Sequence, residues 1–177
     1  MSVENSAHKL AIDCIYEALI FLMDKKEYKD ITITDITKKA GVSRMAYYRN
    51  YTEKDEILLR RLSIYLRQAE KELNNRRDLS KEVFWKTFIR LGQEDPINEY
   101  IMRAGLFEQS FSIHKDYLMR VYTALFGLDM RDQNAVMLIY QKLGSIFGYI
   151  LYMSEHKKDM DTSVMVQHLI RLTEDAV

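Results

Sequence analysis

The sequence predicts an all-α protein, and three observations lead to this expectation. The 177 residues include one proline and six glycines, too few turn residues for the many short strands of an all-β fold. Apolar residues recur at the spacing of helix faces along most of the chain. A helical hairpin with a central glycine lies between residues 31 and 54. We expect about nine helices, with a three-helix domain over residues 1–54 and a larger helical domain over residues 55–177.

Composition and charge indicate a soluble globular protein. The formal net charge is zero, so any nucleic-acid contact must come from a local basic patch. Cys14 is the only cysteine, which excludes an intramolecular disulfide and suits a reducing cytoplasm. No signal peptide is evident, and the longest apolar run, over residues 143–153, is too short to span a bilayer. We therefore expect a cytoplasmic protein with no membrane partner.

The stretch over residues 31–54 has the pattern of two short helices and the start of a third. Thr32 is a good N-cap, and Asp35 three residues later completes a variant of the capping box. Gly41 follows at the position where a left-handed residue ends a helix. Ser43 is placed to cap the second helix, which is rich in Arg and Tyr. This order is typical of a helix-turn-helix, covered by an amphipathic first helix that ends near Asp24.

The charges of this stretch favour contact with DNA. It carries five Lys or Arg residues against two acidic ones, a local excess of three positive charges. Each basic side chain that meets a phosphate releases counterions, so a small basic surface supplies much of the affinity. Arg44 suits the O6 and N7 acceptors of guanine, and Met45, Ala46 or Tyr47 suits a thymine methyl group. The alternative is an ordinary helical hairpin with a solvated basic face.

The pattern T-x-x-D-I-x-x-x-A-G-V-S-R-x-x-x-Y-R-x-Y-x-x-K over residues 32–54 resembles the DNA-binding segment of the TetR family of bacterial transcriptional regulators. The resemblance covers roughly the first third of the chain. It implies that Arg44, Met45 and Tyr47 face base edges, and that Thr32, Ser43, Tyr48 and Lys54 hold the DNA backbone. The expected DNA-contacting residues are Thr32, Thr34, Ser43, Arg44, Met45, Tyr47, Tyr48, Arg49 and Lys54.

Two positions depart from the family pattern. Asn50 stands where the family often has histidine, and Tyr51 stands where it usually has phenylalanine. Asparagine can still donate a hydrogen bond to phosphate, so only that contact is in question. The C-terminal region also resembles the short form found in low-G+C Gram-positive (Firmicutes) members of the family.

The remainder of the chain is expected to be helical, with clear breaks between the helices. The sequence predicts a break at Gly92 and Asp95-Pro96, and an irregular turn or short helix over residues 106–111. The expected helix starts are Thr52, Ser80, Pro96, Lys115, Asp132 and either Asp161 or Thr162.

The last two helices are candidates for a dimer interface. Each carries a broad apolar stripe, and Gly144 and Gly148 allow close approach between helices. The resemblance implies a four-helix interface between two copies. Such a dimer would place its two helix-turn-helix segments about one duplex turn apart on an inverted-repeat operator. The alternative is that these helices pack only within one subunit. The expected interface residues are Ile139, Leu143, Phe147, Ile150, Leu169 and Leu172.

Aromatic and methionine residues accumulate between the long helix and the last two helices, where the resemblance implies a small-molecule pocket. The alternative is that most of them are core residues. The candidate pocket residues are Trp85, Phe88, Tyr100, Phe107, Phe111 and Tyr122.

These observations favour a homodimeric DNA-binding regulator, most simply a repressor released from its operator by an unknown small-molecule ligand. The alternative is a coactivator or corepressor on the same scaffold that acts through a protein partner. An enzyme is disfavoured, because none of the four histidines lies in a recognisable nucleophile or metal motif. His156 and His168, with nearby aspartates, fit a solvated surface better than a metal site, and we expect neither metal nor cofactor.

Overall fold

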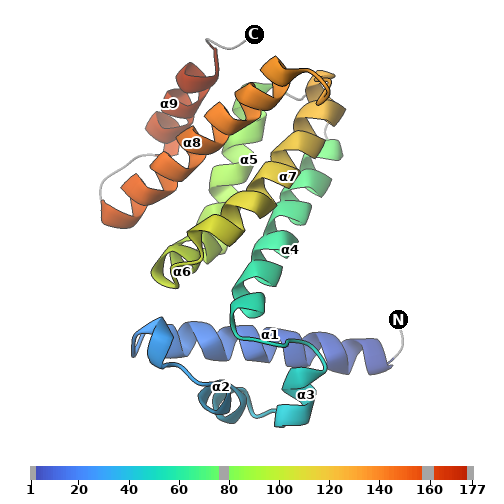
Figure 1. Cartoon of the computed structure of the whole chain (residues 1–177), viewed down its shortest axis with the longest axis vertical. Helices are drawn as coiled ribbons and strands as arrows, with labels where there is room; N and C mark the ends of the chain where they lie inside the picture. The colour runs from blue at the N-terminus through green and yellow to red at the C-terminus, as the bar shows by residue number, and fades with distance from the viewer. Residues whose placement is uncertain (1–2, 76–79, 157–161, 175–177) are drawn as a thin grey trace. The chain divides into compact units, whose positions relative to one another are not determined.

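The computed structural model describes residues 3–75, 80–156 and 162–174, and within these ranges the protein is all-α, as predicted (Figure 1). It contains nine α-helices and one short 3₁₀ helix, with no strand in the described residues. The elements are α1 (Val3–Met23), η1 (Tyr28–Asp30), α2 (Ile33–Ala40), α3 (Arg44–Tyr48), α4 (Asp55–Asn74), α5 (Lys81–Glu94), α6 (Ile97–Arg103), α7 (Phe107–Phe126), α8 (Gln133–Glu155) and α9 (Thr162–Glu174).

The chain folds into two compact units. The first unit comprises Met1–Arg61 together with Tyr100–Leu106, and the second comprises Leu62–Glu99 together with Phe107–Val177. The helices α4 and α6 therefore contribute residues to both units.

The predicted helical hairpin is present in the first unit, with the predicted caps. The Thr32 hydroxyl accepts from the Asp35 backbone N–H at 3.1 Å, and the Asp35 carboxylate accepts from the Thr32 backbone N–H at 2.9 Å. Gly41 ends α2 in the left-handed region with φ of 66°. The Ser43 hydroxyl then accepts from the Ala46 N–H at 3.1 Å and so caps α3. Helix α1 packs against α2 and closes this small core.

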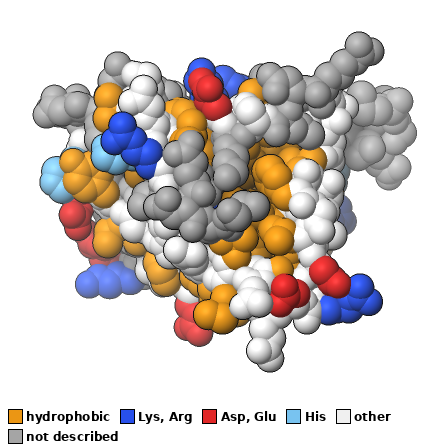
Figure 2. Space-filling view, turned by 90° about the horizontal axis from the view of Figure 1, so that it is seen from above, with side chains coloured by type: hydrophobic (Ala, Val, Ile, Leu, Met, Phe, Trp, Pro, Cys, Tyr) orange, Lys and Arg blue, Asp and Glu red, His pale blue; other side chains and the backbone are white. Residues whose placement is uncertain are grey.

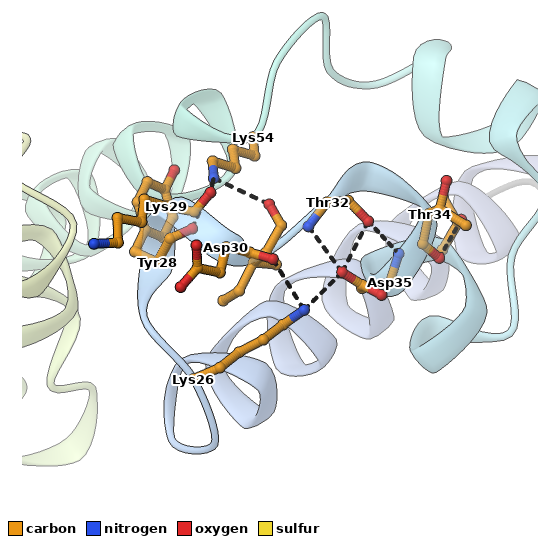
Figure 3. A network of polar contacts seen from close by, with 10 residues as sticks. Lys26, Tyr28, Lys29, Asp30, Thr32, Thr34, Asp35 and Lys54 are labelled. Carbon is orange, nitrogen blue, oxygen red and sulfur yellow. Dashed lines mark hydrogen bonds and ion pairs between the residues drawn. The ribbon is translucent and has the colours of Figure 1, made fainter.

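A polar network joins the start of α4 to the segment that leads into α2 (Figure 3). The Lys54 ammonium donates to the backbone carbonyls of Tyr28 at 2.7 Å and Ile31 at 3.0 Å. The Tyr28 hydroxyl donates to the Asp55 carboxylate at 2.6 Å. Burial, and next this hydrogen bond, raise the pKa of the Tyr28 hydroxyl, so it stays protonated as a donor.

Residues Tyr100–Leu106 pack within the first unit although they are distant from it in sequence. The Arg103 guanidinium forms an ion pair with Asp24 at 3.1 Å and donates to the backbone carbonyl of Met23. These contacts occupy the end of α1, where unpaired carbonyls at a helix C-terminus favour a cation.

In the second unit α5 packs against α9 and α7 packs against α8. Trp85 and Tyr117 are among the largest fully buried side chains. The predicted caps Ser80 and Asp132 are confirmed, since each accepts a hydrogen bond from the first turn of its helix. The cap proposed at Asp161 lies outside the described residues.

Two predicted interruptions are wrong. Gly92 lies inside α5, and residues 106–111 do not form a separate turn, because α7 runs unbroken from Phe107 to Phe126. The polar residues Ser110 and His114 of this segment are buried: Ser110 donates to the carbonyl of Phe107, and His114 Nδ1 lies 2.8 Å from the carbonyl of Ser110. Tertiary burial here outweighs weak local helix propensity.

Residues Gln133–Tyr152 of α8 are long and apolar enough to cross a membrane by length and composition alone. A third of the most apolar stretch is buried inside the protein, and core helices of soluble proteins pass the same test.

The hydrogen bonds around the α2 cap lead to a testable prediction about the pKa of the Asp35 carboxyl. Its hydrogen bond to Lys26 is the largest cause that holds the pKa of Asp35 well below the ordinary value of 3.8, followed by its bonds to Thr32. We expect Lys26→Met to move the pKa of Asp35 back toward 3.8, measured by NMR titration of the side-chain carboxyl carbon. Because the folded pKa is depressed, the stabilisation is present above about pH 4 and is lost as pH falls through the folded value. An unchanged Asp35 titration in Lys26→Met contradicts this account, and the Asp129 carboxyl, paired with Arg131, serves as the internal control.

Candidate nucleic-acid interface and cavity

Helix α3 is short, and the residues at its two ends hold it in place. Its five residues follow the left-handed Gly41 and begin at the Ser43 cap. The Val42 N–H donates to the carbonyl of Thr37 at 3.1 Å, which fixes the turn between α2 and α3. The hairpin therefore presents the outer face of α3 in one defined orientation.

Four of the predicted DNA-contacting side chains lie exposed on or beside this outer face. Met45 is 67% exposed and Tyr48 is 49% exposed, and Arg44 and Arg49 are also exposed. The Arg44 guanidinium lies 3.5 Å from the Tyr48 hydroxyl, and the Arg49 guanidinium lies 3.6 Å from the Met45 sulfur. Each arginine thus contacts a neighbour one turn away through its guanidinium, which limits the rotamers that the arginine samples.

The predicted contacts Thr32, Thr34 and Ser43 are also exposed. Thr32 and Ser43 use their hydroxyls as helix caps, so a backbone phosphate would meet them at the helix N-termini, where N–H groups favour anions. On the same hairpin the Lys39 ammonium lies 3.5 Å from the centroid of the exposed Phe21 ring. The cation is thereby held over the ring while it remains open to solvent.

The structure corrects the role predicted for Tyr47. Its side chain is fully buried and its ring lies edge-on to Tyr48, with centroids 5.3 Å apart, and 5.8 Å from the ring of Tyr51. A base contact would require this ring to leave the core of the first unit. Tyr47 therefore supports the exposed residues of α3 from beneath.

Lys54 and Asn50 also differ from the sequence expectation. The Lys54 ammonium is already bound to the carbonyls described above, so the structure gives it a role in holding the hairpin together. The Asn50 side-chain amide donates to the carbonyl of Ala46 at 2.8 Å, so it caps the end of α3 and does not extend toward solvent. The interaction of Lys54 has no local sequence signal, because its partner Ile31 lies more than twenty residues away.

The predicted pocket residues do not form one site. Tyr100 belongs to the first unit, where its hydroxyl lies 3.5 Å from Asp24. Trp85, Phe88 and Tyr122 are buried in one aromatic cluster of the second unit with Phe84. Phe107 and Phe111 pack with Phe147 and His114 in another cluster. Trp85, Phe88 and Tyr122 are therefore core residues, whereas Phe107 is 45% exposed.

His114 is the buried titratable group of the second cluster. Burial lowers the pKa of its imidazole to about 4, so the ring is neutral at physiological pH. Its Nε2 is buried without a hydrogen-bond partner among the described residues.

A cavity of about 250 Å³ lies wholly within the second unit, away from most of the predicted pocket residues. Its lining is mainly apolar, and Phe88 is the one member that the sequence analysis named. The lining residues are Tyr65, Phe88, Ile89, Gly92, Gln93, Pro96, Asn98, Glu99, Tyr149, Ile150 and Met165.

The residues predicted for a dimer interface are for the most part buried within one subunit. Ile139 and Leu143 are 0% exposed, and Phe147 and Leu169 are also buried, so none of these four is available to a partner. Ile150 lines the cavity, and the side chain of Leu172 lies outside the described residues.

A different face of α8 is open. Figure 2, a view from above, shows hydrophobic side chains at the surface in several patches, with Lys, Arg, Asp and Glu side chains toward the edge. The exposed residues of α8 recur at helical spacing and include both glycines: Met137, Tyr140, Gln141, Gly144, Gly148, Leu151 and Tyr152. A groove of about 700 Å³ follows Gly144 and Gly148 and is bordered by His168 of α9. We refer to these residues as the α8 surface stripe.

Among the residues that the structure describes, no group of three or more His, Cys, Asp or Glu side chains is arranged to hold a metal ion. Asp159 and Asp161, which the sequence places near His156, lie outside the described ranges.

The chain is similar in sequence to curated helix-turn-helix regulators over part of its length. A stretch of 97 residues is 29% identical to the HTH-type transcriptional regulator EthR of Mycobacterium tuberculosis, and equally to that of Mycobacterium bovis. The match covers 52% of this chain and 45% of those relatives, so the chain matches less than half of their length. No protein-family model matches the chain.

Solved structures share the fold over nearly the whole chain. Lin0861 from Listeria innocua is similar with a TM-score of 0.78 and 16% identity, covering 98% of this chain and 93% of that one. The fatty acid degradation regulator FadR from Bacillus halodurans is similar with a TM-score of 0.62 and 13% identity, covering 90% of this chain and 96% of that one. At these identities the likeness establishes the fold.

The two neighbouring tyrosines of α3 provide a test of the interface. We expect Tyr47→Ala to lower the free energy of unfolding by about 3–5 kcal/mol, because it empties a buried aromatic site. We expect Tyr48→Ala to change it by no more than about 0.5 kcal/mol, since the ring is half exposed. Chemical denaturation followed by circular dichroism measures both values. Equal losses for the two variants would contradict the assignment of Tyr47 to the core and Tyr48 to the surface.

Proposed function

We propose that this protein is a TetR-type transcriptional regulator that binds double-stranded DNA through α3. The observation that carries the proposal is the set of exposed side chains Arg44, Met45, Tyr48 and Arg49 on a short capped helix behind a left-handed glycine. Arginines supply phosphate contacts and bidentate contacts to guanine, and tyrosine supplies a phosphate hydrogen bond. The partial similarity to HTH-type regulators and the shared fold support this choice over an enzyme.

The regulator acts as a homodimer on an inverted-repeat operator in the cytoplasm. A five-residue reading helix contacts too few base pairs for genomic specificity by itself, and a twofold copy doubles the site. The α8 surface stripe supports the dimer. It is an exposed apolar row whose two glycines leave room for a helix of the second copy.

The regulator is a repressor, and a small ligand bound in the second unit releases it from the operator. Such regulation requires coupling between the DNA site and the ligand site. The helices α4 and α6 are candidates for this coupling because each contributes residues to both units. The cavity of about 250 Å³ is the candidate ligand site.

Selection of binding sites from a random DNA pool tests the DNA-binding proposal. We expect an enriched inverted repeat, with log affinity falling linearly against log salt concentration. Arg44→Ala is expected to weaken binding to that repeat by about 1–3 kcal/mol and to relax base preference at one position of each half-site. Arg131→Ala, which removes an arginine that is 91% exposed outside the hairpin, is the matched control and should bind normally. No enriched site at low salt would favour a regulator that acts through a protein partner.

Substitution of Gly148 tests the dimer. A Cβ added at Gly148 meets no atom within 4 Å in the subunit, so Gly148→Leu should leave the fold and its thermal stability intact. If a second subunit packs on the α8 surface stripe, the added side chain should shift the protein toward monomer by at least about tenfold in dissociation constant. Sedimentation velocity measures this shift. Gln109→Leu, at an exposed position of α7, is the control, and an unchanged dimer in Gly148→Leu would exclude this face.

A further inference from the structure

Helix α3, to which the proposed function assigns DNA binding, carries an exposed thioether. Met45 is the second residue of α3, and 67% of it is exposed. Of the methionines whose exposure the structure describes, Met137 is the only other exposed one, whereas Met23 and Met165 are buried. An oxidant must meet the sulfur to react with it, so Met45 is one of the two positions that a dissolved oxidant reaches first.

Oxidation changes the polarity of a methionine and leaves the chain intact. One oxygen of hydrogen peroxide bonds to the thioether sulfur, the oxygen–oxygen bond breaks, and the other oxygen leaves with both hydrogens as water. The sulfur is oxidised by two electrons and the peroxide is reduced. The product is a sulfoxide, a polar group that methionine sulfoxide reductases return to the thioether, so the change is reversible.

The neighbour of the Met45 sulfur is a cation of the same helix end. The Arg49 guanidinium lies 3.6 Å from this sulfur. A thioether is a weak hydrogen-bond acceptor, whereas a sulfoxide oxygen accepts well from a charged donor, so oxidation strengthens the contact. Arg49 is then held against residue 45 and is less available to a DNA phosphate.

The apolar contact expected of Met45 is lost as well. A methionine side chain packs favourably against the methyl group that thymine presents in the major groove. A sulfoxide at the same place buries a polar oxygen against that apolar group, which offers it no hydrogen-bond donor. Both effects lower the affinity for DNA. Because Met45 is exposed and contributes little to the core, the fold of the first unit should persist.

We propose that Met45 is a reversible oxidation site, and that its sulfoxide releases α3 from DNA when peroxides are present. The inference rests on the proposed function for its consequence at DNA, whereas the oxidation of Met45 is measured without DNA. Cys14 is the only cysteine of the sequence and belongs to α1, where it is half-buried. The oxidisable sulfur of α3 is therefore a thioether.

Peptide mass spectrometry after timed exposure of the full-length protein to hydrogen peroxide tests the oxidation site. We expect Met45 to be oxidised at least about tenfold faster than the buried Met23 and Met165. The selected inverted repeat should slow the oxidation of Met45 more than an unrelated duplex of equal length does. This follows because DNA binding and oxidation oppose each other, and such coupling is reciprocal.

Binding to the selected repeat, measured before and after peroxide treatment, tests the consequence at DNA. We expect the wild-type protein to lose affinity by at least about tenfold, with an unchanged circular dichroism spectrum. Methionine sulfoxide reductases A and B together should restore the affinity. Dithiothreitol alone should not restore it, because it reduces a disulfide or sulfenic acid of Cys14 and leaves a sulfoxide in place.

Three substitutions locate the effect, and each variant is compared with itself before and after the treatment. Met45→Leu should keep its own affinity after peroxide, because no sulfur remains at this position. Met45→Gln places a polar acceptor there, so we expect it to bind DNA more weakly than Met45→Leu without any treatment. Met137→Leu removes the other exposed thioether and is the matched control, which should stay as sensitive to peroxide as the wild type.

The proposal is overturned if the buried methionines are oxidised as fast as Met45, if the oxidised wild-type protein keeps its affinity, or if Met45→Leu loses affinity as the wild type does. These outcomes leave the DNA-binding function intact. If Met45→Leu binds DNA too weakly to measure, restoration by the reductases in Met137→Leu decides instead. If no DNA site is selected, the proposed function fails, and preferential oxidation of Met45 would uphold the modification site without its effect on DNA.

Discussion

The geometry of the first unit depends on the ammonium group of Lys54. Lys54 directly precedes α4, and its ammonium donates to the carbonyls of Tyr28, the first residue of η1, and of Ile31, which follows η1, more than twenty residues earlier. It also lies 4.4 Å from the centroid of the Tyr28 ring, whose hydroxyl is bound by the next residue, Asp55. These contacts close a loop that contains the whole hairpin. Because both ends of the loop are held, the turn at Gly41 and the cap at Ser43 are sufficient to orient α3.

Local chemistry explains most of the elements that the sequence analysis predicted. The capping box at Thr32, the left-handed Gly41 and the caps at Ser80 and Asp132 each act within one helical turn, so the sequence alone reveals them. The unbroken α7 was missed because burial of Ser110 and His114 stabilises a segment of weak helix propensity. The place of Tyr100–Leu106 beside α1 could not be predicted, since it depends on an arginine that meets a helix end about eighty residues earlier.

The candidate sites were predicted less completely than the fold, for a related reason. A five-residue helix is too short for its apolar period to assign faces, so the sequence analysis gave both Tyr47 and Tyr48 a DNA contact although one is buried and the other half exposed. In α8 the apolar period marks the side that packs within the subunit, as Ile139 and Leu143 show. The exposed side of α8 carries two glycines among apolar and polar residues, so it has no clear apolar period. The cavity was missed because a glycine and a few polar residues in its wall leave no periodic signal.

The alternation of buried and exposed positions in α3 has a consequence for how such proteins diverge. Arg44, Met45, Tyr48 and Arg49 project from a scaffold held by other residues, chiefly Tyr47, the Ser43 cap and the Lys54 network. Under the proposed function, the residues that would select bases are thus physically separate from the residues that keep the protein folded. A duplicated gene could exchange these four outward side chains one at a time and drift from one operator to another, without passing through an unstable intermediate.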